Sequence, residues 1–345
     1  MMNKARWMIT ALLVLGLMAG SVMAQDAAVE PLDPPQEVSV AFVPILKFAT
    51  MYVAKERGIF EKYGLDVSLD PVASGTEAIA FLEQGQIDVG GIAIVTSLWN
   101  GWNQGIDIRV FAPGGLEPFE NSPTQLMVRK ELFDSGEVDT IEDLEGRVVA
   151  VAGGPGSGGE YLLAKALERG GLTIRDIQAQ NLSNADMPAA FANGSIDAAI
   201  FGSPYADQVQ SAGTGTTLAT DLVPGLMTVA FVGSADFLTE RPEAAGRFAL
   251  ALLEAARLMQ GEDYYDDENI AAYLSYVNST EEAIRSGTPV LYDPDLTIPV
   301  EGLADVERVH RENGRTEYDE PIDLGNVITT EFTDFALEAA GSYQP

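Results

Sequence analysis

The residues with the clearest chemical potential form a glycine-rich run in the middle of the chain, Gly153-Gly154-Pro155-Gly156-Ser157-Gly158-Gly159. It follows a β-branched stretch and precedes a helical one, so it is expected to be a strand-to-helix loop. Glycines leave backbone N–H groups uncovered, and the first turn of a helix carries partial positive charge, so such a loop can hold an anionic or carbonyl group. A tight turn that binds nothing is the alternative. We interpret the loop as part of a ligand-binding site.

The same glycines also match a dinucleotide-binding pattern. Gly154, Gly156 and Gly159 have the G-x-G-x-x-G spacing, and Asp176 lies about twenty residues further on, where an acid would meet a ribose. The spacing is common by chance, and an exported protein does not ordinarily meet NAD. An NAD-linked oxidoreductase that uses residues 154–159 is kept as the alternative function. A P-loop is excluded because no Gly-Lys-Ser/Thr follows.

Catalytic groups of other kinds are scarce in this sequence. The chain has no cysteine and one histidine, His310, which lies among charged residues and is expected to be a solvated surface residue. A metal site needs several such ligands, and a nucleophile such as Ser157 needs a base, and the sequence indicates neither. We therefore predict a protein that is not an enzyme and that holds no cofactor and no metal.

The first residues have the pattern of a secretory signal peptide. Lys4 and Arg6 precede an almost wholly apolar run from Met8 to Met18, and Ser21-Val22-Met23-Ala24 supplies small residues at the spacing of a cleavage site. The apolar run is shorter than the roughly 18 to 20 residues that a spanning helix needs. We predict that residues 1–24 direct export and are then removed.

Composition limits the compartment and the partners. Because the chain has no cysteine, it lacks the residue that a lipoprotein anchor requires, so we expect a periplasmic protein and not a lipoprotein. The 52 acidic residues outnumber the 20 basic ones, which gives a net charge of −32. Such a surface repels nucleic acid and anionic lipid. We therefore predict no nucleic-acid partner.

The elements that must position the glycine loop follow an alternating pattern. Short β-branched runs alternate with helical stretches, which is typical of βα units and a mostly parallel sheet. The pattern runs once from residue 38 and starts again near residue 126. We predict an α/β protein of two lobes, each an open, mostly parallel sheet flanked by helices. The predicted division is a flexible leader at 25–37, lobe 1 at 38–123, lobe 2 at 124–226, and a return to lobe 1 with a helical C-terminal region at 227–345.

Three phrases resemble segments of the substrate-binding proteins of ABC importers for nitrate, sulfonates, taurine and thiamine-pyrimidine-like compounds. The first is AKERGIFEKYGLDV at 54–67. The second is LEQGQIDVG at 82–90, with an echo, FANGSIDAA, at 191–199. The third is IEDLEGRVVAV at 141–151, and it resembles the phrase that opens the second lobe in that family.

The resemblance implies a fold, a function and a partner. The fold is that of a type II periplasmic binding protein. The function is that of the extracytoplasmic solute-binding component of an ABC importer, which captures a small molecule by lobe closure and delivers it to a permease subunit in the inner membrane. We expect a monomer. Two ligand classes stay open: a planar heterocycle, such as a pyrimidine thiamine precursor or riboflavin, and a monoanion of the sulfonate or nitrate type.

Candidate binding residues follow from the rule that ligands of open α/β sheets settle beyond the carboxyl ends of the strands. Lys47 is the only strong cation on these loops, so a multiply charged anion would have few partners. Phe48, Tyr52 and Tyr205 are expected to face the ligand, whereas Trp99 is expected in the core. The candidates are Lys47, Phe48, Tyr52, Gly75, Thr76, Val95, Thr96, Gly156, Ser157, Gly158, Gly159, Asn184, Ser203 and Tyr205.

Overall fold

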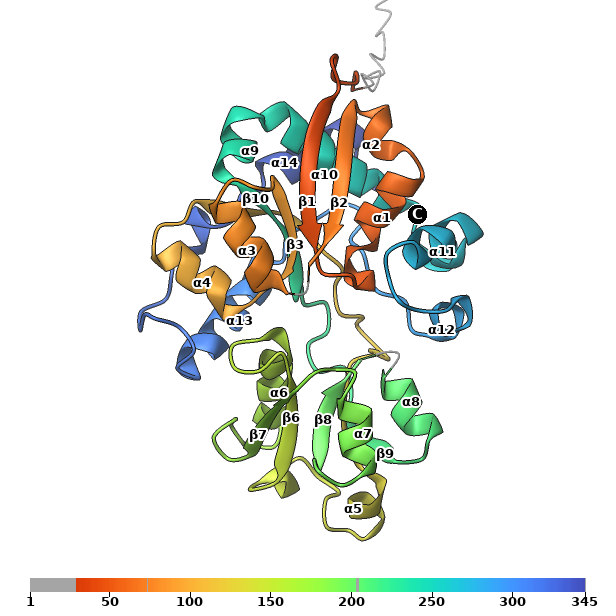
Figure 1. Ribbon diagram of the computed structural model, residues 1–345, viewed down its shortest axis with the longest axis vertical. Coiled ribbons are helices and arrows are strands. Elements are labelled where there is room, and N and C mark those ends of the chain that lie inside the picture. The colour runs from red at the N-terminus through yellow and green to blue at the C-terminus, as the bar shows by residue number, and fades with distance from the viewer. Residues whose placement is uncertain (1–28, 73, 203–204, 345) are drawn as a thin grey trace, which may run out of the picture.

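Two separate β-sheets divide the chain into two lobes (Figure 1). The structure is a computed structural model, and it describes residues 29–72, 74–202 and 205–344. The sheet of lobe 1 has the strand order β2-β1-β3-β10-β4, and the sheet of lobe 2 has the order β7-β6-β8-β5-β9. The strands of lobe 1 are β1 (Gln36–Phe42), β2 (Leu65–Pro71), β3 (Val89–Ala93), β4 (Ile108–Pro113) and β10 (Val229–Ser234).

Helices cover both faces of the lobe 1 sheet. Along β1, the side chains of Val38, Val40 and Phe42 pack into one apolar cluster and that of Ala41 into another, because side chains alternate along a strand. Helices α1, α10 and α14 pack on the first face, and α3 and α4 pack on the second. The helices of this lobe are α1 (Ala49–Glu56), α2 (Ile59–Lys62), α3 (Gly75–Glu83), α4 (Thr96–Asn103), α9 (Ala235–Glu240), α10 (Pro242–Arg257), α11 (Asp267–Leu274), α12 (Glu281–Ser286) and α14 (Glu331–Ala340).

One helix that the sequence predicts as continuous is divided in the structure. The predicted helix runs from Ala49 to Tyr63, but α1 and α2 are separated at Gly58, whose φ of 69° is left-handed. A left-handed residue cannot continue a right-handed helix, and glycine adopts this conformation without the steric cost that a Cβ would add. The chain then turns at Gly64 into β2, as predicted.

Lobe 2 repeats the architecture with fewer helices. Strand β6 pairs in parallel with β7 and β8, whereas β5 runs antiparallel to β8 and β9. The predicted fold class, two α/β lobes with mostly parallel sheets, is confirmed. The elements are β5 (Gln125–Arg129), α5 (Lys130–Asp134), β6 (Val148–Ala152), α6 (Gly158–Glu168), β7 (Gln178–Leu182), α7 (Met187–Ala192), β8 (Ala198–Phe201), α8 (Tyr205–Ser211) and β9 (Gly215–Ala219).

Two segments carry the chain between the sheets, residues 114–124 after β4 and residues 220–228 before β10. They lie side by side and are hydrogen-bonded to each other: the Glu117 N–H donates to the Leu226 carbonyl at 2.9 Å, and the Gly225 N–H donates to the Glu117 carbonyl at 2.9 Å. The two crossings therefore form one short connection between the lobes.

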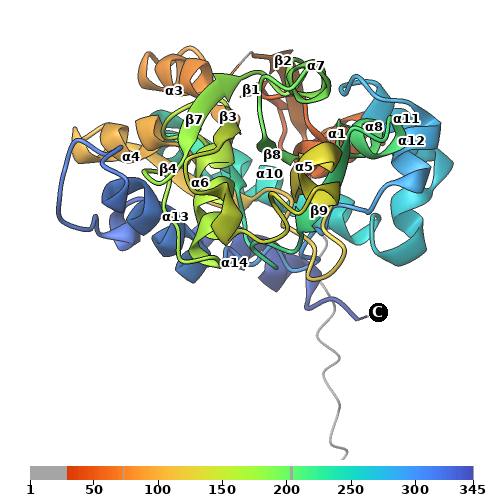
Figure 2. The same ribbon diagram turned by 90° about the horizontal axis from the view of Figure 1, so that it is seen from below.

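The C-terminal region returns to lobe 1 and also reaches lobe 2. Helix α13 (Val300–Glu312) packs against α4 of lobe 1 and α6 of lobe 2, and Figure 2 shows it beside α4 and α6 when the molecule is seen from below. The following segment is fixed to the edge of lobe 1, since the Val110 N–H donates to the Val327 carbonyl at 2.9 Å. The short 3-10 helices are Leu46–Phe48, Glu142–Leu144, Gly261–Tyr265 and Leu324–Asn326.

The N-terminal part of the described chain lies against lobe 1. The predicted signal peptide, residues 1–24, lies outside the described residues. Within the predicted leader, the Leu32 N–H donates to the Tyr63 carbonyl at 3.2 Å, and β1 already begins at Gln36. The described part of that segment is therefore held on lobe 1 and is not free of it. Over the described ranges, no helix combines the length and the apolar character needed to cross a bilayer.

Candidate functional site

Three helix N-termini from the two lobes meet at one place. Helices α3, α4 and α6 follow β2, β3 and β6, so each begins beyond the carboxyl end of a parallel strand. The Thr76 and Ser97 hydroxyl oxygens lie 3.2 Å apart, which joins the starts of α3 and α4. The Thr96 hydroxyl donates to the Gly156 carbonyl at 2.9 Å, which joins the start of α4 to the glycine loop before α6. The predicted convergence of these loops is therefore present in the structure.

The starts of α3 and α6 are capped by serines of the same loops. The Ser74 hydroxyl accepts from the Glu77 N–H at 3.3 Å. The Ser157 hydroxyl accepts from the Glu160 N–H at 3.1 Å and donates to the Ala152 carbonyl at 2.7 Å. The N–H groups of the first turn have no acceptor within their own helix. In α6 these groups belong to Gly158 and Gly159, so they are available to an acceptor group of a ligand.

The start of α4 is capped by the other lobe. Val95, the residue before α4, has no side chain that could accept a hydrogen bond. Instead, the Gly156 carbonyl accepts from the Thr96 N–H at 3.0 Å as well as from its hydroxyl. Gly156 has a φ of 75°, and a Cβ at this position would overlap the Thr96 hydroxyl and lie 2.8 Å from the Thr96 Cβ. The approach of the two lobes at this point requires glycine.

A carboxylate of the chain itself occupies part of the glycine loop. Glu160 is buried, and its Oε2 accepts from the Gly156 N–H at 2.7 Å. Arg315 forms a two-pronged ion pair with the same carboxylate, with Nη2 at 2.7 Å from Oε1 and Nε at 3.0 Å from Oε2. The Gly156 amide is thus already bonded, which leaves the amides of Gly158 and Gly159 as the donors of this loop.

Lys47 lies at the connection between the lobes and is paired. Its Nζ contacts the Glu117 carboxylate and donates to the Thr228 hydroxyl at 2.7 Å. Glu117 is buried, and its second carboxylate oxygen accepts from the hydroxyls of Ser122 at 3.1 Å and Thr124 at 3.3 Å. Lys47 was predicted as the one strong cation of the site, but the structure neutralises its charge with a buried carboxylate that sequence reasoning missed.

Phe48 and Tyr52 do not face the junction between the lobes, so their prediction as stacking residues is wrong. Both side chains are fully buried in the lobe 1 core. The Phe48 ring lies edge-on to Phe231 at 5.4 Å between centroids, and the Tyr52 ring stacks on Tyr276 at 4.7 Å. The Tyr52 hydroxyl donates to the Ile45 carbonyl at 3.0 Å, and burial raises the pKa of Tyr52 well above its ordinary value. They were misplaced because a helix starting at Ala49 turns these rings inward.

The remaining candidates lie at the same sheet edges. Gly75 is buried beside Ile92, and Val95 is half-buried. In lobe 2, Asn184 is exposed in the turn between β7 and α7, and Tyr205 is half-buried at the start of α8, packed on the smaller core of that lobe. Ser203 lies outside the described residues. Trp99 is fully buried, which confirms its prediction as a core residue.

His310 is not on the surface, so its prediction as a solvated residue is wrong. Its side chain is fully buried between α4, α6 and α13. The Trp99 indole N–H donates to His310 Nδ1 at 2.9 Å, and His310 Nε2 lies 3.4 Å from the Ser157 carbonyl oxygen. An Nδ1 that accepts a hydrogen bond carries no proton, and burial lowers the pKa of His310. The ring is therefore held neutral.

The buried imidazole predicts a stability that falls in mild acid. The folded protein keeps His310 neutral, whereas the unfolded chain takes up a proton near the ordinary pKa of about 6.5. Because the unfolded state then binds more protons, the free energy of unfolding decreases below that pH, by at most about 1.4 kcal/mol per pH unit. The nearest charges, Glu160 and Arg315, act on the ring in opposite directions.

Urea unfolding of the parent and of His310→Gln between about pH 7.5 and 5 measures this effect. The many carboxylates of the chain titrate in both proteins, so the informative quantity is the difference between the two. We expect the parent to lose stability relative to His310→Gln as the pH falls. Parallel pH profiles would contradict a neutral, buried His310.

The comparison with known protein families decides the identity of this architecture. Residues 32–276 match the model of the NMT1-like family. The chain belongs to the NMT1-like family. The match begins in the segment that packs on lobe 1 and ends in the region after α11, so it includes both sheets and the junction described above.

Similar proteins place this NMT1-like chain among binding proteins. A protein of Brucella abortus that is named as a binding protein is 27% identical over 207 residues, which are 59% of this chain and 60% of that protein. The crystal structure of the periplasmic aliphatic sulphonate binding protein SsuA from Escherichia coli is similar with a TM-score of 0.67 at 22% identity, and covers 86% of this chain and 92% of its own. The periplasmic nitrate-binding protein NrtA from Synechocystis PCC 6803 gives a TM-score of 0.68 at 17% identity, covering 89% of both chains.

The fold of this NMT1-like protein is also compatible with catalysis. The crystal structure of the desulfurization enzyme DszB is similar with a TM-score of 0.64 at 15% identity, covering 88% of this chain and 99% of that chain. At such identity the likeness concerns the fold alone. Whether a member of this fold binds or transforms its ligand therefore depends on the residues at the junction between the lobes.

Proposed function

We propose that this protein is the periplasmic solute-binding component of an ABC importer, exported by the N-terminal signal peptide. It captures a small molecule between its lobes and delivers it to a permease in the inner membrane. Membership of the NMT1-like family and the two-lobed fold support this function. The observation that carries it is the meeting of the α3, α4 and α6 N-termini at the junction of the lobes.

We further propose that the ligand is a small organic monoanion of the sulfonate or carboxylate type. Helix N-termini favour a negative group, and the amides of Gly158 and Gly159 with the hydroxyl of Thr76 offer hydrogen-bond donors for it. Lys47 is already neutralised by Glu117, so no full positive charge compensates a second negative charge. Two of the three aromatic rings expected to stack on a heterocycle are buried in the core, which weakens the case for a pyrimidine or flavin ligand.

Binding without catalysis fits the groups at this junction. Among the described residues nearest to the Ser157 hydroxyl, the acceptor of its proton is the Ala152 carbonyl, which is not a base. The rival NAD-linked oxidoreductase would place a pyrophosphate on the amides of residues 154–159. The Gly156 amide instead holds the Glu160 carboxylate, whose charge repels phosphate. The function proposed here therefore requires no cofactor.

The test is ligand identification on the purified mature protein. Native mass spectrometry detects any ligand that is retained through purification, and calorimetry with ethanesulfonate, nitrate and riboflavin then compares the classes. We expect saturable binding of ethanesulfonate and none of riboflavin, with one protein chain per particle in light scattering. Tight binding of riboflavin alone would replace the anion by the heterocycle. Quenching of NADH fluorescence or hydride transfer would overturn the transport function.

A further inference from the structure

Helix α13 and the turn after it connect the two lobes a third time. The segment 300–317 is attached to lobe 1, where Trp99 bonds His310 and the Asn100 side chain accepts from the Glu317 N–H at 2.9 Å. The same segment packs on α6 of lobe 2. We call residues 300–317 the C-terminal clasp.

The clasp makes the apolar interior continuous between the lobes. A single cluster of buried side chains includes Leu98 of α4, Val306 and Val309 of the clasp, and Leu163 of α6. A rotation that separated lobe 2 from lobe 1 on this side would expose these side chains to water, which is unfavourable in proportion to the apolar area uncovered. The two crossing segments are therefore not the only groups that resist opening.

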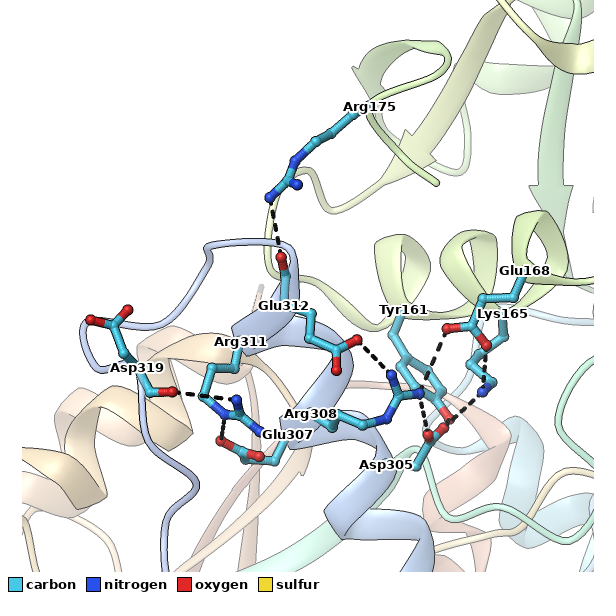
Figure 3. Close-up of polar contacts among 10 residues, drawn as sticks. All are labelled: Tyr161, Lys165, Glu168, Arg175, Asp305, Glu307, Arg308, Arg311, Glu312 and Asp319. Carbon is cyan, nitrogen blue, oxygen red and sulfur yellow. Dashed lines mark hydrogen bonds and ion pairs between the residues drawn. The ribbon is translucent and has the colours of Figure 1, made fainter. Parts of the chain in front are cut away.

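A polar network covers the same contact on its outer side (Figure 3). The Tyr161 hydroxyl of α6 donates to Asp305 of the clasp at 2.8 Å, and Lys165 pairs with the same carboxylate at 3.1 Å. The Arg175 guanidinium of lobe 2 donates to the Glu312 carbonyl at 3.1 Å. Three separate positions of lobe 2 are thus bound to one helix that lobe 1 carries.

The buried member of the contact is the ion pair of Arg315 with Glu160. Arg315 follows α13 on the lobe 1 side, and Glu160 belongs to the first turn of α6. The side chain of Glu160 is 2% exposed, so its charge is stabilised by its partners and not by water. Glu160 also accepts from the Gly156 N–H, and the Gly156 carbonyl caps α4. Arg315 is therefore coupled through Glu160 to the glycine loop.

We propose that the C-terminal clasp holds lobe 2 against lobe 1 before ligand binds, and that Arg315 is a positioning residue that fixes the glycine loop through Glu160. Opening of the lobes separates Arg315 from Glu160 and leaves a buried carboxylate unpaired, so the closed arrangement is favoured without ligand. The consequence for ligand rests on the proposed binding function: the loop amides are arranged in advance, and release of the ligand requires the clasp to part.

The distance between the lobes in the ligand-free protein tests the clasp. The chain has no cysteine, so Gln208→Cys on α8 and Glu282→Cys on α12 introduce two spin labels at exposed positions of lobe 2 and lobe 1. Both helices lie on the side of the molecule opposite α13, where a rotation of the lobes moves the labels furthest (Figures 1 and 2). We expect Arg315→Met to lengthen and broaden the distance distribution measured by pulsed electron paramagnetic resonance.

Arg311→Met is the matched control. Arg311 also lies in the clasp and pairs at 3.0 Å with a buried glutamate, but that glutamate, Glu307, belongs to α13 itself. We expect this variant to keep the parental distribution. Tyr161→Phe removes only the hydroxyl bond to Asp305 and covers the case in which Arg315→Met does not fold. It is expected to shift the distribution in the same direction by a smaller amount.

Parental distributions in folded Arg315→Met and Tyr161→Phe would overturn the clasp. A second measurement connects it to binding: ethanesulfonate should dissociate roughly tenfold faster or more from Arg315→Met, since truncating one partner of a buried pair acts mainly on dissociation. The two proposals fail separately. If no ligand binds, the distances in the free protein still decide the clasp; if ethanesulfonate binds with parental distances and release in the variants, only the clasp is lost.

Discussion

Replacing Gly156 by alanine is expected to weaken ligand binding while lobe 2 stays folded. The new Cβ would overlap the Thr96 hydroxyl, which belongs to the other lobe, so the clash exists only when the lobes are together. Overpacking of this kind costs about 1–3 kcal/mol, which corresponds to roughly a 5- to 150-fold loss of affinity if it is confined to the closed state. Calorimetry with ethanesulfonate measures the loss directly.

The strain of a left-handed alanine has to be separated from this clash. Gly171 has nearly the same φ, 68° against 75°, but a Cβ there would meet nothing within 4 Å. Gly171→Ala therefore reproduces the backbone strain within the same lobe without the contact between lobes. We expect it to lower the free energy of unfolding by about 1 kcal/mol and to leave the affinity unchanged. Equal affinities of both variants would remove Gly156 from the closing contact.

The sequence could predict the architecture because each lobe is specified locally. β-branched runs, helical periodicity and glycine turns occur in a repeated order, and none of these signals depends on distant partners. The glycine loop was placed correctly at the start of α6 for the same reason, since a strand, seven loop residues and a helix are contiguous.

Side-chain direction was predicted less well than position. Phe48 and Tyr52 follow a strand that ends at the junction, but the short 3-10 helix at Leu46–Phe48 and the start of α1 turn both rings into the core. His310 could have been placed from the sequence. It lies seven residues after Leu303 and four after Val306, a spacing that puts all three on one face of a helix, and both leucine and valine are buried. The charged neighbours of His310 belong to the opposite face.

The pairs that join distant segments could not be read from the sequence. Glu160 and Arg315 are 155 positions apart, and Lys47 and Glu117 are 70 apart. Among 52 acidic residues no local pattern marks the two that are buried against a cation. Their burial is a property of how the lobes pack, which is decided only after each lobe has formed. These pairs nevertheless determine which charges remain available to a ligand.

Lys47→Met is expected to destabilise the protein strongly, because Lys47 compensates a buried charge. Removal of its Nζ leaves Glu117, 2% exposed, without its cation. Breaking a buried ion pair from one side typically costs about 3–5 kcal/mol, whereas replacing both partners by apolar residues is often close to neutral. Urea unfolding should therefore show a large loss for Lys47→Met and a substantial recovery in the double variant Lys47→Met with Glu117→Met.

The same series distinguishes a structural lysine from a ligand-binding one. If Lys47 held the ligand anion directly, Lys47→Met would abolish binding of ethanesulfonate with little effect on stability, and Glu117→Met would leave binding intact or improve it. If the pair fixes the connection between the lobes, the stability loss comes first, and the double variant regains both stability and a measurable affinity. The Thr228 hydroxyl, which also accepts from Lys47, ties the second crossing segment to the same pair. Loss of the pair should therefore loosen both crossings together, because one cation bonds a residue on each.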